Sequence, residues 1–275
     1  MSQSKLSFPD YFSAFAANYT KQTGNSTRQM FADSYDEISA IKPFEQTSVI
    51  HDNAAGPGTA ASVITDRLPH DSVPSILVTD NVPRMVDAAK ATFESWPQVE
   101  TKVLDSLDLA DIPDEHFTHS ILNFSIFTFS DPLKGLQEIH RTLKTDGLAV
   151  LPTWKRFGAG KTIHGAQALV RPDLPRMWIP RPEFFEEGVL EKLAIEAGFE
   201  ADKIQVLQKT VIVKGEELHE GLKVFMQGDM MKPARQGWTD EEEARWPAAV
   251  EEAIQGEVDA FGGVKFEAWL VLAKK

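Results

Sequence analysis

The chain has 275 residues, of which 42% are hydrophobic and 25% are charged, as in an ordinary globular protein. Its net charge of −13 disfavours nucleic acid and anionic membranes as partners. The chain lacks cysteine, which excludes a disulfide framework, a thiolate metal site and a cysteine nucleophile. It also lacks a basic leader segment and any run of eighteen apolar residues, so we expect a cytoplasmic protein. We also expect no metal site.

Residues 1–46 show the spacing of amphipathic helices. Apolar side chains, many of them aromatic, recur every three to four positions, which predicts helices over 9–22 and 26–40 with a break at Gly24. Two interpretations of this helical cap stay open. Its aromatic side chains either cover one edge of the core or close over a bound ligand.

The stretch 48–61 has the pattern of a nucleotide-binding turn. A short apolar run leads to Asp52, small residues follow, and a helical pattern begins near Thr59. Gly56 and Gly58 permit positive φ and a close approach of the backbone to a ligand. Read from Gly56, the stretch satisfies the dinucleotide fingerprint in its G-x-G-x-x-A form.

A second template begins at Asp52. There Asp-x-Ala-x-Gly-x-Gly resembles the acidic-x-Gly-x-Gly-x-Gly loop of class I S-adenosylmethionine (SAM) methyltransferases, with alanine replacing the first glycine. The segment Asp-Asn-Ala-Ala-Gly-Pro-Gly is similar to the corresponding loop of fungal small-molecule methyltransferases, among them the thiol methyltransferases of gliotoxin metabolism. The segment from Tyr19 to Arg28 resembles the lead-in of the same enzymes. The resemblance implies that SAM, and its product S-adenosylhomocysteine, would contact these residues: Tyr19, Asp52, Ala54, Gly56 and Gly58.

Acidic and amide residues follow each of the next three predicted strands. The strands span 75–79, 98–104 and 118–124, and ligands of parallel sheets bind at the carboxyl ends of strands. Asp80 follows the first of them and can accept hydrogen bonds from both ribose hydroxyls, although it could instead cap the helix that begins at Pro83. The resemblance implies that Asp105 takes the adenine amino group. It also completes the expected cofactor contacts with Asn81, Met85, Ser106, Leu107 and Asn123.

Regular alternation of strands and helices continues to about residue 155 and then fails. A helix over 132–143 is expected to end with a cap at Gly147 and to lead into a strand over 148–154. Residues 155–182 contain four prolines, which predicts a loop-rich excursion with a functional role. The remaining pattern predicts helices over 182–197, 216–231 and 240–260 and strands over 203–214 and 264–272.

These elements predict a single α/β domain with a seven-stranded, mostly parallel, doubly wound sheet of the class I methyltransferase type. A helical N-terminal cap would span 1–46, a SAM-binding core 47–155, and a substrate side with late insertions 156–275. The segment from Gln137 to Leu151 is similar to the E-x-x-R-x-L-x-x-x-G helix that leads into the fifth strand of these methyltransferases.

Methyl transfer is favoured over hydride transfer. A short-chain dehydrogenase needs a Tyr-x-x-x-Lys pair late in the domain, but the tyrosines are Tyr11, Tyr19 and Tyr35. The acidic residue at 105 matches a methyltransferase position that hydride-transfer folds do not require. Asn123-Phe124-Ser125 differs from the Asp/Asn-Pro-Pro-Tyr/Phe motif of amino methylases, which disfavours base methylation.

The expected reaction is SN2 transfer of a methyl group from SAM to an O, S or N atom of a hydrophobic small molecule, such as a secondary metabolite. Alignment of the reactants is the chief requirement, and a general base is optional. His164 is the candidate base because it lies in the excursion after the fifth strand. Flexible apolar residues in the segments near the strand ends are the candidate substrate contacts: Phe127, Trp154, Met177, Trp178, Phe225 and Met226.

Two other functions remain open at this stage. The first is a protein methyltransferase of the kind that regulates fungal secondary metabolism, because an acidic surface would suit basic peptides. The second is a SAM-binding protein that performs no methyl transfer. The acceptor atom and the oligomeric state stay undetermined.

Overall fold

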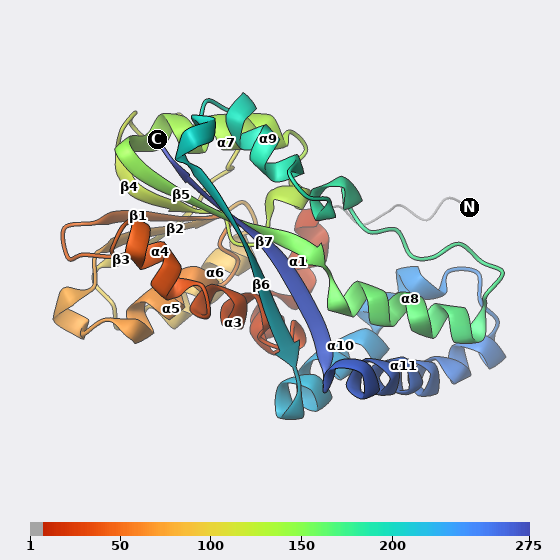
Figure 1. Ribbon diagram of the computed structural model, residues 1–275. Coiled ribbons are helices and arrows are strands. Elements are labelled where there is room, and N and C mark those ends of the chain that lie inside the picture. The colour runs from red at the N-terminus through yellow and green to blue at the C-terminus, as the bar shows by residue number, and fades with distance from the viewer. Residues whose placement is uncertain (1–7) are drawn as a thin grey trace.

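The computed structural model describes residues 8–275, so the first seven residues of the predicted cap lie outside the described part (Figure 1). Seven strands form one sheet in the order β3-β2-β1-β4-β5-β7-β6. Strands β1 to β5 pair in parallel, and β7 is antiparallel to both β5 and β6. This confirms the predicted seven-stranded, mostly parallel sheet. The strands are β1 (Val49–Asn53), β2 (Ser75–Asp80), β3 (Val99–Val103), β4 (Phe117–Ile121), β5 (Leu143–Arg156), β6 (Ile204–Val213) and β7 (Val264–Lys274).

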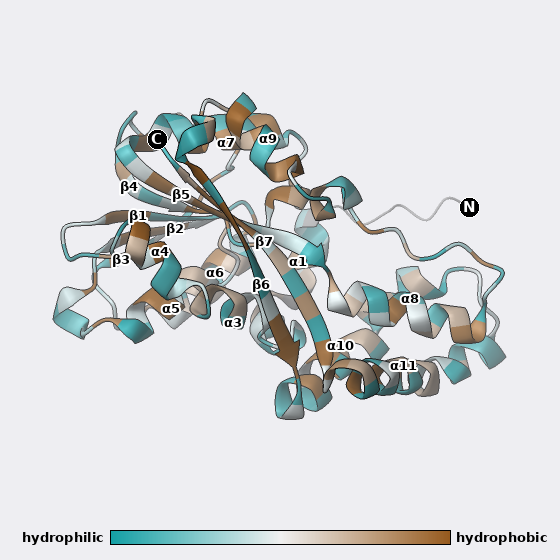
Figure 2. Cartoon of the chain, viewed as in Figure 1, coloured by the Kyte–Doolittle hydropathy of each residue, from teal (hydrophilic) through white to brown (hydrophobic). Residues whose placement is uncertain are grey.

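Helices cover both faces of the sheet. One face packs against α3 (Ser26–Ala32), α4 (Tyr35–Ile41), α5 (Thr59–Arg67) and α6 (Pro83–Thr92), and the other packs against α7 (Pro132–Thr142) and α9 (Val189–Glu196). Strand β5 shows the alternation that two buried faces require. Leu148 and Val150 pack into the first core, whereas Ala149 and Leu151 pack into the second. The middle of β5 is accordingly a continuous apolar run, and brown stretches mark the long strands of the sheet in Figure 2.

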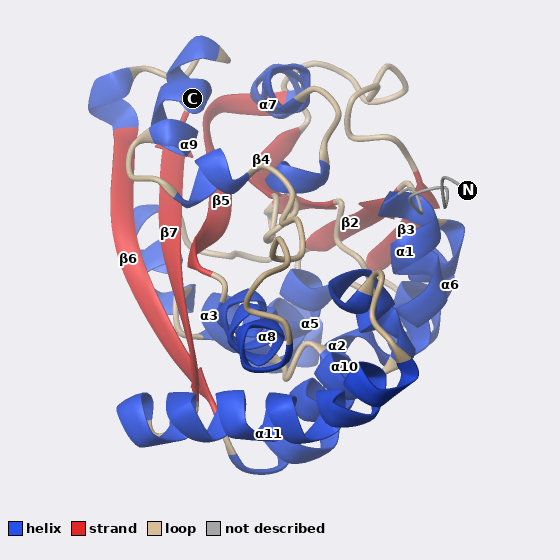
Figure 3. Cartoon of the chain, turned by 90° about the vertical axis from the view of Figure 1, so that its right-hand side faces the viewer, coloured by secondary structure: helices blue, strands red, loops and turns tan. Residues whose placement is uncertain are grey.

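A third hydrophobic core lies beyond the carboxyl ends of the parallel strands. It contains Trp154 at the end of β5, Phe266 of β7, and buried side chains of three helices. These helices are α8 (Gly158–Val170), α10 (Lys223–Gln227) and α11 (Asp240–Phe261). They form the helical layer next to the ends of the long strands β6 and β7 in Figures 1 and 3. The late insertions therefore enlarge the end of the sheet where a ligand is expected.

The N-terminal cap is helical, as predicted, but it is more broken than its apolar spacing indicates. It consists of α1 (Phe8–Phe15), the 3-10 helix η1 (Ala16–Asn18), α2 (Tyr19–Gln22), α3 and α4. Gly24 forms the predicted break, with φ of 60°, and a Cβ there would lie 2.8 Å from Val213 Cγ1. A second break separates α3 from α4, where the Ser34 hydroxyl donates a hydrogen bond to the carbonyl of Met30.

The predicted loop-rich excursion over 155–182 is wrong for its first half. Residues 158–170 form helix α8, which packs its Ala and Ile residues into the third core. A Cβ at Gly158 would lie 2.5 Å from the Lys265 carbonyl oxygen, and a Cβ at Gly160 would lie 3.0 Å from Ile179 Cδ1. These glycines therefore allow close packing of a helix.

Three other predicted boundaries also differ. Gly147 does not cap α7, which ends at Thr142, because β5 begins at Leu143 and Asp146 takes the positive φ of 63°. The helix predicted over 182–197 is divided at Gly188, which has a positive φ. The helix over 216–231 is divided into a π-helix, α10 and a 3-10 segment. The short elements are η2 (His70–Ser72), η3 (Ile126–Thr128), η4 (Pro182–Phe185), η5 (Ala201–Lys203), π-helix η6 (Glu217–Leu222) and η7 (Asp229–Arg235).

Within residues 8–275, none of the helices combines the length and the apolar character that crossing a membrane requires.

Two histidines are buried in the centre of the sheet. His51 of β1 contacts the Thr79 hydroxyl through Nε2 at 2.8 Å and stacks on Phe117. His119 of β4 lies between the Thr118 hydroxyl and the Lys42 carbonyl. Burial disfavours the charged imidazolium and lowers the pKa of His51 to about 3 and that of His119 to about 4. Both side chains are therefore neutral at pH 7.

Acid should destabilise the fold through His119. Unfolded His119 takes up a proton as the pH falls through 6.5, whereas the folded side chain stays neutral until about pH 4. Unfolding therefore binds an extra proton in this window, and the free energy of unfolding falls by up to about 1.4 kcal/mol per pH unit from this residue. A His119→Gln variant should lose that slope between pH 4 and 6.5 in urea unfolding curves. Buried carboxyls contribute equally to the pH dependence of unfolding in both proteins, so their contribution cancels when the variant is compared with wild type. The same slope of unfolding free energy against pH in both proteins would contradict the prediction.

Candidate functional site

The turn between β1 and α5 is held in left-handed backbone conformations. Ala54, Gly56 and Gly58 have φ values of 46°, 58° and 81°. Ala54 stands where the methyltransferase loop has glycine, and its conformation costs roughly 1 kcal/mol. A Cβ at Gly56 would meet only the Met85 Sδ, at 3.8 Å, so open space lies beside this residue. The open position at Gly56 allows a ligand to approach the backbone.

Asp52 lies beneath this turn. Its side chain is buried, and its Oδ2 accepts a hydrogen bond of 2.8 Å from the Ala61 N–H and another from the Ala60 N–H, in the first turn of α5. Burial, with a smaller contribution from the nearby Asp80 charge, raises the pKa of Asp52 to about 7 despite these hydrogen bonds. The Asp52 carboxyl therefore fixes the start of α5 from below.

Asp80, at the end of β2, connects the turn to α6. Its Oδ2 accepts a hydrogen bond from the Gly56 N–H at 2.8 Å, and its Oδ1 accepts one from the Val82 N–H at 2.9 Å. Asp80 is not the N-cap of α6, which was the alternative role for this residue, because α6 begins at Pro83 and its N-cap residue is Val82. The Asn81 N–H is a further backbone partner, and an ionised carboxylate has about four acceptor sites, so acceptor capacity remains for a ligand. Burial raises the pKa of Asp80 above its ordinary value.

Tyr19 lies next to this pair of loops. Its hydroxyl hydrogen-bonds with the Thr27 side chain, and its ring packs with Phe12 against the cluster that contains Val82 and Met85. Burial raises the pKa of Tyr19 to about 12, and the Asp80 charge adds to the shift. The structure thus brings Tyr19, Asp80 and Met85 together, although they come from different parts of the chain.

The β3 side of the site is a turn over 105–108. Asp105 is exposed, and its Oδ1 accepts a hydrogen bond from the Leu107 N–H at 2.9 Å. Ser106 is buried, and its hydroxyl donates to the Asn53 Oδ1 at 2.8 Å. Asn81 is exposed at the end of β2. The sequence analysis included Asn53 in the loop motif but assigned it no role. A polar amide at the end of a buried strand was the signal that could have identified it.

Asn123 ends the row of polar residues at the carboxyl edge, just after β4. It is buried, and its Oδ1 has no hydrogen-bond partner among residues 8–275. The same holds for the Oγ of Ser125 and the Oγ1 of Thr59 at the start of α5. Between Asn123 and Ser125, Phe124 has a φ of 55°, which is strained for an aromatic residue. Unpaired buried acceptors and hydroxyls, together with the open position at Gly56, fit a polar ligand such as a nucleoside.

The predicted substrate residues surround the third core. Trp154 stacks on Phe124 with ring centroids 3.9 Å apart and is buried together with Phe225 and Met226. Phe127 and Met177 pack against this cluster while remaining partly exposed. Trp178 is 62% exposed, on the segment between α8 and η4. The sequence could not separate the buried members of this group from the partly exposed ones.

His164 lies on helix α8 rather than in a loop, which corrects the expected setting of this residue. Its Nε2 donates a hydrogen bond to the Met177 carbonyl at 2.8 Å, and the nearby Gln167 Oε1 accepts one from the Met177 N–H at 2.9 Å. Both side chains thus hold the segment 171–181, which returns from the far end of α8 and passes in front of the sheet (Figure 3). Burial lowers the pKa of His164, so its ring is neutral at pH 7. Gln167 was missed by the sequence interpretation.

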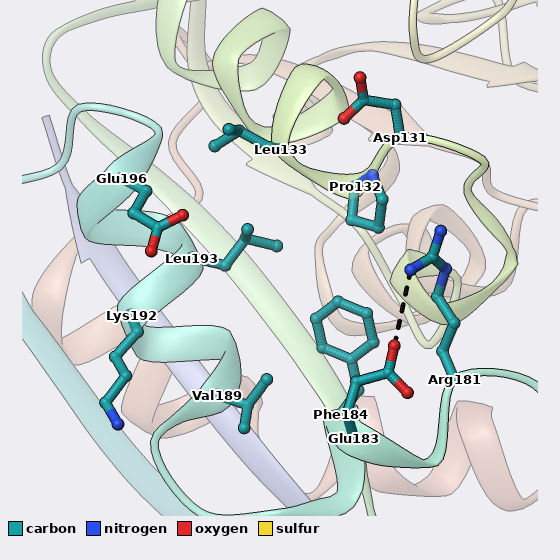
Figure 4. Close-up of a pocket in the computed structure, with 10 residues that line it drawn as sticks. All are labelled: Asp131, Pro132, Leu133, Arg181, Glu183, Phe184, Val189, Lys192, Leu193 and Glu196. Carbon is teal, nitrogen blue, oxygen red and sulfur yellow. Dashed lines mark ion pairs between the residues drawn. The ribbon is translucent and has the colours of Figure 1, made fainter.

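A shallow hollow of about 380 Å³ opens elsewhere, between the start of α7, η4 and α9 (Figure 4). Arg181 and Glu183 form an ion pair of 3.5 Å across one side of it, and the Arg181 Nε donates to the Phe129 carbonyl. Lys192 and Glu196 of α9 line its other side. None of the predicted site residues lines this hollow.

Part of the chain is similar to known methyltransferases. Residues 51–151 match the family of methyltransferase domains. The chain is 31% identical over 173 residues to methyltransferase ucsB of an Acremonium species, across 53% of this chain and 60% of that protein. It is 25% identical over 284 residues to methyltransferase ktnA of Aspergillus niger, across 92% and 93% of the two chains.

Solved structures share the fold at low sequence identity. A phosphoethanolamine N-methyltransferase of Haemonchus contortus, in complex with phosphomonomethylethanolamine and S-adenosylhomocysteine, matches all of this chain and 61% of its own, with a TM-score of 0.55 and 12% identity. The [4+2]-cyclase SpnF matches 88% of this chain and 81% of its own, with a TM-score of 0.52 and 17% identity. These likenesses concern the fold alone.

Proposed function

We propose that this chain, a class I SAM-dependent methyltransferase resembling fungal secondary-metabolite enzymes, methylates an O, S or N atom of a hydrophobic small molecule. The observation that carries the proposal is the pairing of Asp80 with the Gly56 backbone at the carboxyl ends of β1 and β2. It combines an acidic acceptor for ribose hydroxyls with an open glycine turn. A nucleoside cofactor needs both features in one place.

The proposed cofactor contacts follow the carboxyl edge of the sheet. The turn at Gly56 would face the methionine end, Asp80 would accept the ribose hydroxyls, and Asp105 with Leu107 would take the adenine. Tyr19 would close the site from the cap, because its hydroxyl already lies near Asp80. Asp52 and Gly58 would act from beneath by holding α5. Ala54, Asn81, Met85 and Asn123 complete the proposed contacts, and the buried Ser106 would act from within the turn over 105–108.

When bound, SAM supplies a methyl group on a positively charged sulfur, which is itself an activated donor. The chain then has to align the acceptor with this methyl group and exclude water. The third core suits the first task, because Trp154 and Phe124 form a rigid stacked pair next to Asn123 at the end of β4. The segment 171–181 suits the second, because it crosses the same end of the sheet (Figure 3).

The apolar character of the third core supports a hydrophobic acceptor. The partly exposed Phe127 and Met177 at its margin, with Trp178 on the neighbouring segment, are the proposed substrate contacts. Trp154, Phe225 and Met226 would support them from within the core. The resemblance of the loop at Asp52 to fungal small-molecule methyltransferases favours a secondary metabolite as the acceptor. The proposal includes the cytoplasmic location that the sequence predicts.

His164 is the proposed base if the acceptor is a phenol or a carboxylic acid. Its Nε2–H donates to the Met177 carbonyl, which leaves Nδ1 unprotonated and able to accept a proton. A His164→Gln variant should keep S-adenosylhomocysteine affinity and lower turnover about 100-fold, which is the usual size of a general-base effect. The wild-type rate should fall at a pH below 6.5, because the pKa of His164 is lowered. Equal turnover in wild type and variant would limit His164 to holding Met177.

The proposal is tested by incubating the purified protein with methyl-labelled SAM and three acceptor pools. The pools are a fungal metabolite extract, core histones and buffer alone. Label in a small apolar product supports the proposal, whereas label in histones would establish the protein methyltransferase alternative. Binding of S-adenosylhomocysteine without label transfer to any pool would favour a non-methylating protein, a possibility that the shared fold of a cyclase keeps in view.

A further inference from the structure

Four polar side chains form a buried hydrogen-bonded chain beneath the site. The His51 Nε2 lies 2.8 Å from the Thr79 hydroxyl, which lies 3.4 Å from the Asn53 Oδ1. The Ser106 hydroxyl donates to the same Oδ1 at 2.8 Å. His51, Thr79 and Asn53 are fully buried, and Ser106 is 5% exposed. The chain therefore crosses from β1 and β2 to the turn over 105–108.

The direction of these bonds follows from the chemistry of the amide. An amide oxygen only accepts, so the hydroxyls of Thr79 and Ser106 both donate to Asn53. The Thr79 oxygen then accepts from the Nε2–H of His51, whose ring is neutral because of its burial. The bond from Ser106 is short, whereas the bond from Thr79 is near the limit of hydrogen bonding, so Ser106 is the main partner of Asn53.

Among the described residues, the hydrogen bond from Ser106 to Asn53 is the one side-chain hydrogen bond that joins the turn over 105–108 to β1. At the edges of the turn, the Leu104 N–H donates to the Asp80 carbonyl and the Leu109 N–H donates to the Glu138 carboxylate. Between these points, Asp105 is held by two local bonds, from the Leu107 N–H to its carboxylate and from the Asp108 N–H to its carbonyl. The packing of Leu107 and the bond of Ser106 to Asn53 tie this part of the turn to the rest of the fold. A shift of Ser106 would therefore move the exposed Asp105 carboxylate.

Asn53 is a poor choice for stability alone. Its Nδ2 is buried and has no hydrogen-bond partner within residues 8–275. A leucine at this position would avoid burying two unpaired donors, so the amide lowers stability relative to an apolar side chain. The next residue, Ala54, packs against an apolar cluster that also takes in Leu104 and Leu107.

We propose that Asn53 is a positioning residue that sets the selectivity of this enzyme for the adenine base, by fixing Ser106 and through it Asp105. The inference rests on the proposed function, in which Asp105 accepts a hydrogen bond from the adenine amino group. Asn53 contacts no reacting atom in this account. It acts through the turn over 105–108.

The test compares S-adenosylhomocysteine with S-inosylhomocysteine, which carries an oxygen in place of the adenine amino group. Calorimetric titration of wild type should show a preference for the adenine compound. Asn53→Leu should lower affinity for S-adenosylhomocysteine about tenfold while changing affinity for the inosine compound less than about threefold. Ser106→Ala should have the same effect, and the double variant should show no further loss because both act through one bond.

Ser120→Ala is the matched control. Ser120 is buried in β4 beside His51, and its hydroxyl has no hydrogen-bond partner in the described chain, so both affinities should stay at wild-type values. An unchanged preference in Asn53→Leu and Ser106→Ala would overturn the proposal, and Ser106→Ala alone decides it if Asn53→Leu does not fold. A wild type that binds neither compound would instead contradict the proposed function.

Discussion

A Gly56→Val variant should fold and lose binding of S-adenosylhomocysteine, whereas Gly58→Val should lose stability. Both residues have positive φ, which costs a β-branched side chain roughly 1–2 kcal/mol. At Gly56 the added Cβ meets only Met85, at 3.8 Å, so the valine would extend into the space proposed for the cofactor. At Gly58 the Cβ would lie 2.4 Å from the Phe93 ring, which is buried under α5 and α6. Overpacking there adds roughly 1–3 kcal/mol to the backbone cost.

Urea unfolding and calorimetric titration separate the two effects. Gly56→Val should retain most of its stability and show no measurable binding at ligand concentrations that saturate wild type. Gly58→Val should unfold at clearly lower urea concentration. The sequence assigned the ligand contact to both glycines, and the structure divides the roles between them. Retained affinity in Gly56→Val would mean that the cofactor does not lie against this turn.

An Asp80→Ala variant should lose at least about tenfold in affinity for S-adenosylhomocysteine. Hydrogen bonds from the two ribose hydroxyls to a carboxylate are worth roughly 1.5–3 kcal/mol each at most, and 1.4 kcal/mol corresponds to a factor of ten. The loss should exceed that of the ribose bonds alone. The variant also leaves the Gly56 and Val82 N–H groups without their acceptor, which loosens the turn.

Asp80→Asn serves as the matched control for this effect. It retains one carbonyl-type oxygen and the shape of the side chain but removes the charge, so its affinity should lie between wild type and alanine. Wild-type affinity should also fall on acidification, because protonation of Asp80 removes acceptor capacity and its pKa is raised by burial. Unchanged affinity in Asp80→Ala with a normal urea midpoint would remove Asp80 from the cofactor site.

Local sequence patterns were sufficient to predict the sheet and the polar residues at its edge. Apolar runs before Asp52 and Asp80 and an alternating segment before Asp105 are local signals of strands, and a ligand edge needs polar side chains. The parallel order of these strands follows from their alternation with helices. The same local signals carried the resemblance to class I methyltransferases.

The contacts of the glycines and the apolar residues depend on long-range packing and could not be predicted from local sequence. Gly58 packs against Phe93, Gly160 packs against Ile179, and neither partner can be read from local sequence, because a glycine fits a turn and a close helix contact equally well. His164 was expected in a loop because prolines follow it, but α8 forms since its apolar face is buried against α11 and β7. The hydrogen-bonded chain from His51 to Ser106 joins residues 55 positions apart in sequence, which the alternation pattern of single strands does not encode. Local patterns therefore indicated the strands and most of the helices, whereas long-range packing decided the formation of α8 and which side chains meet.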